Sequence, residues 1–94
     1  MSYIIRWDKK AKEFLNKIGK ANAQRIIKKV NDIVDCPRHY LEFLVDIEGY
    51  KLRIGDYRAL IDLDESNKLI DVLLVGHRRD VYKYLKRTGF KLKK

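Results

Sequence analysis

The pattern of apolar and polar positions divides the chain into a helical part and a strand-forming part. Alternation from Ser2 to Trp7 predicts a first strand. Apolar residues then recur every three or four positions over residues 11–18 and 23–34, which predicts two helices separated near Gly19, a residue type that commonly ends helices. The short break makes the two helices an antiparallel hairpin, and Pro37 is expected to end the second.

The second half of the chain predicts strands. Residues 41–48 alternate and form either a short edge strand or an extended loop. Residues 50–54 and 57–63 alternate on both sides of Gly55-Asp56, a two-residue hairpin signal. Residues 69–75 form an almost unbroken apolar run, which is typical of a central strand buried on both faces.

A short helix is expected after the last strand, with Asp80 as its N-cap and a basic tail, residues 86–94, that is partly frayed. Strands joined by short turns are antiparallel. The prediction is therefore an α+β fold in one domain, residues 1–94. It has an N-terminal strand, a two-helix hairpin packed on one face of an antiparallel three- to four-stranded sheet, and a short C-terminal helix.

The hairpin turn also predicts which side chains share a face of the sheet. It places Arg53 opposite Arg58 and Lys51 opposite Leu60, so three cations converge on one face. Directly opposed like charges destabilise a sheet, although long side chains can splay into water, where the repulsion is screened. The alternative is a face that binds a polyanion. In either case, we expect Arg58→Ala to leave stability unchanged or slightly raised.

Composition narrows the class of partner. The 94 residues carry 22 Lys and Arg against 13 Asp and Glu, a net charge of +9. This charge favours nucleic acid, an acidic protein or an anionic membrane, and the 46% hydrophobic content indicates a globular chain. Cys36 is alone, and neither a signal peptide nor a membrane-spanning apolar run is recognisable, so we expect a cytoplasmic protein without a membrane partner.

Two segments carry a family resemblance. Residues 49–58 read GYKLRIGDYR, and residues 75–82 read VGHRRDVY one strand later; residues 35–38, DCPR, fit the same pattern. In this order and spacing they resemble the RelE/ParE toxin superfamily, and its RelE branch most closely. The resemblance implies a RelE-like fold and a toxin of a type II toxin–antitoxin system. RelE-type toxins enter the ribosomal A site and cleave mRNA with a cluster of basic side chains.

The resemblance also implies a catalytic set. The family's basic strand residue falls on Lys51, and the arginine of its Gly-Asp-Tyr-Arg turn falls on Arg58. The arginine after its last strand falls on Arg78, and its C-terminal tyrosine falls on Tyr82. Lys51 is the candidate base, with a pKa lowered by neighbouring cations, and Arg58 the phosphate clamp. Arg78 would stabilise charge near the leaving oxygen or act as the acid. Tyr82 would stack on a base or orient the 2′-hydroxyl, although its spacing with Leu85 fits a core position equally well.

Further basic residues are candidate RNA contacts: Arg53, His77, Arg79 and the helical-hairpin lysines Lys9, Lys10, Lys12 and Lys17. The lysines read either as a solvated face or as phosphate contacts. His77 either caps the end of the strand or takes part in proton transfer. The chain departs from some relatives at Gly49, where they carry a second lysine, at His77, where they carry lysine, and in a shorter segment before Tyr82.

Attack of a 2′-hydroxyl on the adjacent phosphorus needs no metal, and the sequence has no cluster with metal-ligand spacing, so we expect no cofactor. The resemblance implies a RelB-like antitoxin, the ribosome with its rRNA, and mRNA as partners. Two alternatives remain: a ParE-like inhibitor of DNA gyrase without catalysis, and a non-catalytic basic RNA-binding module.

Overall fold

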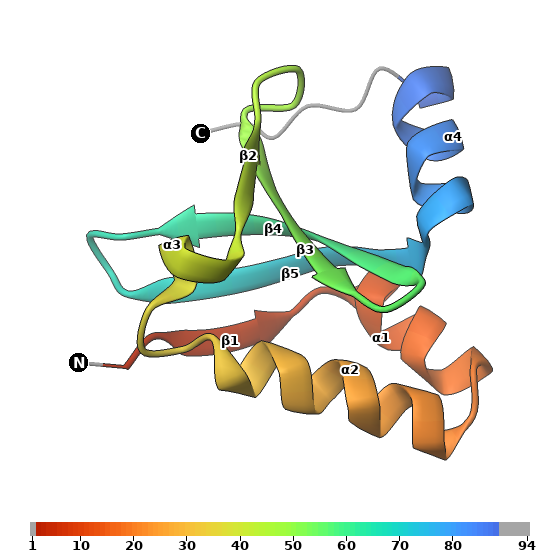
Figure 1. Cartoon of the computed structure of the whole chain (residues 1–94), viewed down its shortest axis with the longest axis horizontal. Helices are drawn as coiled ribbons and strands as arrows, with labels where there is room; N and C mark the ends of the chain where they lie inside the picture. Colours follow the sequence, from red (N-terminus) through yellow and green to blue (C-terminus); the bar gives the residue numbers. More distant parts are fainter. Residues whose placement is uncertain (1, 89–94) are drawn as a thin grey trace.

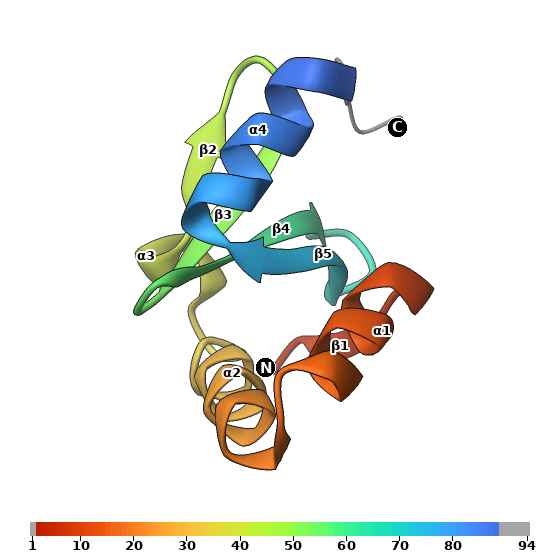
Figure 2. The same ribbon diagram turned by 90° about the vertical axis from the view of Figure 1, so that its right-hand side faces the viewer.

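The computed structural model describes residues 2–88 and shows a five-stranded sheet with helices on both faces (Figure 1). Figure 2 shows α1 and α2 on one side of β4 and β5, and α4 on the other. In chain order the elements are β1 (Ile4–Trp7), α1 (Lys9–Lys17), α2 (Lys20–Asp32), α3 (Pro37–Tyr40), β2 (Glu42–Leu44), β3 (Gly49–Ile54), β4 (Tyr57–Asp64), β5 (Leu69–His77) and α4 (Arg78–Thr88).

The sheet is mixed. Its strand order is β1-β5-β4-β3-β2, with β1 parallel to β5 and all other pairs antiparallel. The α+β class and the antiparallel strands β2 to β5 are confirmed, and the ambiguous residues 41–48 include the edge strand β2. The parallel addition of β1 was not predicted. The rule for short turns does not apply to β1, because three helices and three strands separate it from β5 along the chain.

The helical hairpin forms as predicted, with Gly19 at a φ of +88° between α1 and α2. Pro37 does not end α2, which stops at Asp32. It begins α3 instead, because its restricted φ and missing N–H suit the first turn of a helix. Asp80 is not the N-cap of α4, which starts at Arg78; it lies in the first turn, where its charge favours the positive end of the helix dipole. The predicted frayed tail is helical to Thr88, and the rest of it lies outside the described residues.

Two apolar cores lie on opposite faces of the sheet. The larger one, between the sheet and α1 and α2, has twelve buried residues: Ala11, Ile26, Val30, Ile33, Leu52, Ile54, Ala59, Ile61, Leu63, Ile70, Val72 and Val75. The smaller one, beneath α4, has three: Ile47, Leu60 and Val81. The packing of the helical hairpin on one sheet face is therefore confirmed, and α4 covers part of the other face.

A register shift interrupts the pairing of β5 with β4 before α4 begins. Leu60 pairs with Leu74 and Ile61 pairs with Val72, so Leu73 is an extra residue between them. Beyond it, Leu74 faces α4 and Val75 faces the larger core, the reverse of uninterrupted alternation. The shift therefore brings both faces of the run 69–75 into apolar packing.

Among the described residues, no helix combines the length and apolar character required to cross a membrane.

Candidate active site

The predicted hairpin register is confirmed. Arg53 pairs with Arg58 and Lys51 with Leu60, whereas Leu52 and Ile54 face the larger core. The backbone N–H of Arg78 donates to the carbonyl oxygen of Asp56 at 2.8 Å, which ties the first residue of α4 to the β3–β4 turn. Lys51, Arg53, Arg58 and Arg78 therefore gather where the hairpin turn meets the end of β5, and we call this group the cation face.

Lys51 and Tyr82 meet across the space between β3 and α4. The Lys51 Nζ donates to the Tyr82 Oη at 3.0 Å and lies 5.3 Å from the centre of the Tyr82 ring. Only 15% of the Lys51 side chain is exposed, whereas Tyr82 is 46% exposed. Tyr82 is therefore not a core residue, because Val81 and Leu85 take the inward positions of α4.

The electrostatics of this pair contradict one expectation. The pKa of Lys51 is raised, first by its hydrogen bond with Tyr82 and then by Glu42, against the opposing effect of burial. The expected lowering of this pKa is wrong, because the nearest partners of Lys51 are a phenol and a carboxylate and not other cations. The pKa of Tyr82 is lowered, mainly by the hydrogen bond from Lys51 and further by Arg58. The Lys51 ammonium is thus stabilised, and ionisation of the Tyr82 hydroxyl is made easier than in an isolated tyrosine.

Arg58 is buried, with 6% of its surface exposed. Its Nη1 donates to the carbonyl oxygens of Gly55 and Tyr57, each at 2.7 Å, and so holds the β3–β4 turn. Arg53, directly opposite, is exposed. The two guanidinium groups therefore do not both splay into water. The hydrogen bonds argue against the expectation that Arg58→Ala leaves stability unchanged, since this substitution removes two charge-assisted bonds.

The other predicted site residues lie on or near this face. Arg78 and Arg79 are exposed, and within residues 2–88 neither they nor Arg53 form an ion pair with a carboxylate. The His77 Nδ1 accepts a hydrogen bond from the backbone N–H of Arg79 at 3.3 Å, so its ring caps the start of α4. The expected cap was at the end of the strand, whereas this contact is at the start of the helix, and a part in proton transfer stays a prediction.

The four lysines of α1 are exposed. One of them, Lys10, reaches α4: its Nζ lies 3.3 Å from the Tyr84 Oη and 5.3 Å from the ring centre. The others, Lys9, Lys12 and Lys17, lie along the same helix. The structure thus brings Lys51, Arg58 and Tyr82 together and ties the backbone of Arg78 to the β3–β4 turn, while the α1 lysines lie on a neighbouring surface.

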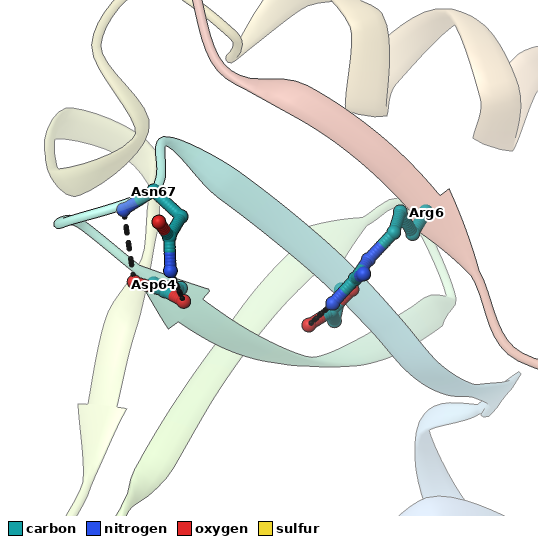
Figure 3. Close-up of polar contacts among 4 residues, drawn as sticks. Arg6, Asp64 and Asn67 are labelled. Carbon is teal, nitrogen blue, oxygen red and sulfur yellow. Dashed lines mark hydrogen bonds and ion pairs between the residues drawn. The ribbon is translucent and has the colours of Figure 1, made fainter.

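The opposite end of the sheet is arranged differently. There Arg6 binds Asp71 through two nitrogens at 2.6 and 3.0 Å. Asn67 donates to Asp64 through its backbone N–H at 3.1 Å and its side-chain amide at 2.9 Å, which closes the β4–β5 turn (Figure 3). The arginine at that end is neutralised by a carboxylate, whereas the exposed arginines of the cation face are left available to an anionic ligand.

Sequence reasoning missed Glu42. It lies opposite Lys51 in the β2–β3 ladder, and its Oε1 is 3.3 Å from the Lys51 Nζ. The signal that points to it is the alternation of residues 41–48, because an edge strand paired with β3 places Glu42 or a neighbour across from Lys51.

Comparison with known proteins shows the family and the fold of this chain. The family model described as "ParE toxin of type II toxin-antitoxin system, parDE" matches residues 5–82. The chain belongs to this family, and so to the RelE/ParE superfamily that its motifs resemble. It is a toxin of a type II toxin–antitoxin system. No curated protein sequence matches it.

Three solved structures show the same fold. The RelBE2 toxin–antitoxin complex of Mycobacterium tuberculosis contains a chain with 22% identity and a TM-score of 0.76, covering 83% of this chain and 100% of that one. The RelE–RelB complex of Pyrococcus horikoshii contains a chain with 25% identity and a TM-score of 0.66, and the match covers 83% of this chain and 97% of that one. The isolated E. coli RelE toxin has 24% identity and a TM-score of 0.66, and the match covers 92% of this chain and 98% of that one.

Proposed function

We propose that this toxin is a ribosome-dependent endoribonuclease that cleaves mRNA in the ribosomal A site, with its own side chains supplying the acid, the base and the positive charge. The observation that carries the proposal is the 3.0 Å hydrogen bond between Lys51 and Tyr82 on the cation face. It pairs Tyr82, whose ionisation is favoured by its surroundings, with Lys51, which remains positively charged, on the face that also carries three arginines.

The reaction begins when Tyr82, as the phenolate, takes the proton from the 2′-hydroxyl of the RNA. The 2′-oxygen then attacks the adjacent phosphorus, and the bond to the 5′-oxygen breaks. Arg78 protonates that oxygen, or stabilises its charge while a water molecule supplies the proton, which leaves a 2′,3′-cyclic phosphate and a 5′-hydroxyl. Lys51 stabilises the extra negative charge at phosphorus. This assignment moves the role of base from Lys51 to Tyr82, because the pKa of Lys51 is raised and that of Tyr82 is lowered.

Arg58, on β4, binds the phosphate in this scheme. Its Nη1 is engaged by the turn, so the guanidinium orientation is set before RNA arrives. A pre-oriented donor needs little rearrangement during the reaction, which is the condition for strong stabilisation of developing charge.

Dependence on the ribosome follows from the openness of the site. Tyr82 is 46% exposed, and Arg53, Arg78 and Arg79 are exposed as well. Such a surface binds phosphates but does little to hold a single strand in the in-line geometry that attack requires. A ribosome that fixes the mRNA supplies that geometry, and the net charge of +9 favours docking on rRNA.

The same charge suits an antitoxin. The M. tuberculosis and P. horikoshii relatives were solved as complexes with RelB proteins. We extend this to the present chain as a RelB-like partner that neutralises the toxin in the cytoplasm.

A second candidate function comes from the family model itself, which is that of ParE. In that case the protein inhibits DNA gyrase by binding it, without catalysis. A non-catalytic RNA-binding module is the third alternative.

The deciding experiment is primer extension on a translated mRNA, with and without ribosomes. Tyr82→Phe removes the phenolic oxygen from the site, and Tyr40→Phe is the matched control on α3, also exposed. We expect ribosome-dependent cuts that persist in the control and fade in Tyr82→Phe. Equally fast cleavage of free RNA would overturn ribosome dependence. Intact mRNA together with inhibited supercoiling by DNA gyrase would show that the protein is a gyrase inhibitor. RNA that is bound but not cut would show that it is a non-catalytic RNA-binding module.

A further inference from the structure

A carboxylate lies beside the most buried lysine of an otherwise cationic surface. Glu42, the first residue of β2, pairs with Lys51 in the β2–β3 ladder and ion-pairs with it at 3.3 Å. Among the described residues it is the carboxylate that forms an ion pair with the cation face. A surface that only collects RNA would gain affinity by losing Glu42, because the carboxylate repels phosphates.

The geometry gives Glu42 a different use. A lysine ammonium sits on a flexible four-carbon stem and has no preferred direction of its own. Here it is held from two sides, by the Tyr82 hydroxyl on α4 and by the Glu42 carboxylate on β2. Glu42 comes from the neighbouring strand of a hairpin, whereas Tyr82 lies 31 residues later in the chain, so the Lys51 ammonium is fixed only once α4 packs against the sheet.

We infer that Glu42 is a positioning residue of the proposed cleavage: its carboxylate holds the Lys51 ammonium against the Tyr82 hydroxyl and keeps the proton on Lys51. The inference rests on the proposed function, because it concerns the division of acid and base roles within that site. Glu42 does not touch the reacting atoms in this scheme and acts through Lys51.

The charges around the pair agree with this role. Glu42 faces Lys51 from β2 and contributes to its raised pKa, while Arg58 faces Tyr82 from β4 and contributes to its lowered pKa. Arg53 lies on the same face of β3, and no other charged group among the described residues contributes to either shift. Removing the charge of Glu42 should lower the pKa of Lys51, which loses a counter-ion, and raise that of Tyr82, because a displaced ammonium no longer makes the hydrogen bond that is the main cause of the lowered pKa of Tyr82.

The first test uses Glu42→Gln with Glu13→Gln as the matched control. The control makes the same change at an exposed position of α1, away from the Lys51–Tyr82 pair. Tyr82 is titrated by ultraviolet absorption of tyrosinate, and each protein is measured against its own Tyr82→Phe version because the chain has six tyrosines. We expect Tyr82 to titrate at higher pH in Glu42→Gln than in the parent and in the control, because the released ammonium no longer stabilises the phenolate. An unmoved titration in a folded Glu42→Gln protein would overturn the inference.

The second test follows cleavage of ribosome-bound mRNA. A displaced ammonium should lower kcat by about tenfold or more, since small misplacements in a site have effects of this order. KM should fall at the same time, because a repulsive charge is gone. Glu42→Asp, which keeps the charge, should restore the titration of Tyr82 toward that of the parent. An unchanged kcat in Glu42→Gln would overturn the positioning role.

The two tests separate two failures. The tyrosine titration needs neither RNA nor ribosomes, so it decides whether Glu42 controls the Lys51–Tyr82 pair even in a protein that cleaves nothing. Absence of cleavage in every variant, the parent included, would instead overturn the proposed function and, with it, the catalytic meaning of the pair.

Discussion

The two faces of the sheet differ in what they bury. The face beneath α1 and α2 has twelve buried apolar residues, whereas the face beneath α4 has three and also carries Lys51, Arg53 and Arg58. Burial of apolar surface is the main source of folding free energy, so the first face supplies most of the stability. The second face is left free to carry charges and, apart from Arg58, which bonds to the β3–β4 turn, these contribute little to folding.

The same two strands supply both faces. On β3, Leu52 and Ile54 enter the larger core while Lys51 and Arg53 point the other way. Because alternate residues of a strand lie on opposite faces, a substitution on one face leaves the packing of the other largely unchanged. Stability and activity should therefore be separable by choice of residue, and this can be tested.

The largest effect on stability is expected on the α1–α2 face. Ile26 is fully buried, and Ile26→Ala should lower the free energy of unfolding by about 2–5 kcal/mol, the range for large-to-small changes in a core. Ile27 is its neighbour on the same helix and is 37% exposed, so Ile27→Ala is the control and should be much milder. Urea unfolding of both variants measures the difference, and equal losses would refute the assignment of stability to this face.

Arg58 is the residue at which one substitution should affect both stability and activity. Arg58→Ala removes two hydrogen bonds to turn carbonyls and should destabilise the protein by about 1.5–3 kcal/mol, the range for bonds with a charged donor. It should also lower the cleavage rate by roughly a hundredfold or more. Arg78→Ala should reduce the rate comparably while leaving stability nearly unchanged, because the Arg78 side chain is exposed. Thermal melts and cleavage rates of both variants decide this, and an Arg58→Ala protein as stable as the parent would favour simple charge repulsion between Arg53 and Arg58.

Tyr82→Phe should lower the activity and leave the stability nearly unchanged. The ring remains while the proton-accepting oxygen is lost, so the cleavage rate should fall by about a hundredfold, the lower end for general acid–base catalysis. The free energy of unfolding should change by less than about 0.5 kcal/mol, as for most exposed positions. Urea unfolding is measured alongside the rate, and a variant that unfolds more easily would mean that the α4 face holds more of the stability than its small core suggests.

The pH dependence of cleavage follows from the two pKa shifts. A base acts when deprotonated, so the rate should rise with pH up to the lowered pKa of Tyr82, below its ordinary value of 10.0. Lys51 acts when protonated, so the rate should fall again only above 10.5, since its pKa is raised. The profile is measured in parent and Tyr82→Phe proteins, with spontaneous RNA hydrolysis subtracted. A rising limb that survives in Tyr82→Phe would exclude Tyr82 as the base.

The smallest effect per residue is expected for the α1 lysines. Replacing Lys9, Lys10, Lys12 and Lys17 with glutamine should weaken ribosome binding without unfolding the domain, because all four are exposed. If each lysine neutralises one phosphate, the slope of log affinity against log salt should decrease by about 3, at roughly 0.7–0.9 for each phosphate no longer neutralised. An unchanged slope across the salt series would show that these lysines form only a solvated surface.

Much of the fold could be predicted along the chain because its signals are local. The spacing of apolar residues predicted both helices of the hairpin, and Gly55-Asp56 predicted a turn that places Arg53 opposite Arg58. These patterns depend on residues a few positions apart, so the chain expresses them before it is folded. Pro37 shows the limit of such local signals, since the same residue type can end one helix or begin the next.

The sequence by itself determined most strands and helices of this toxin, the face on which its cations lie and, through its motifs, its family. Only the tertiary structure decided that β1 pairs in parallel with β5 at the edge of the sheet and that Tyr82 faces solvent and Lys51 instead of the core. It also decided that Glu42 forms an ion pair with Lys51. It also reversed the expected shift in the pKa of Lys51. The physical reason is that a proton affinity depends on neighbours through space, and those of Lys51 come from β2 and α4, nine residues earlier and thirty-one residues later in the chain.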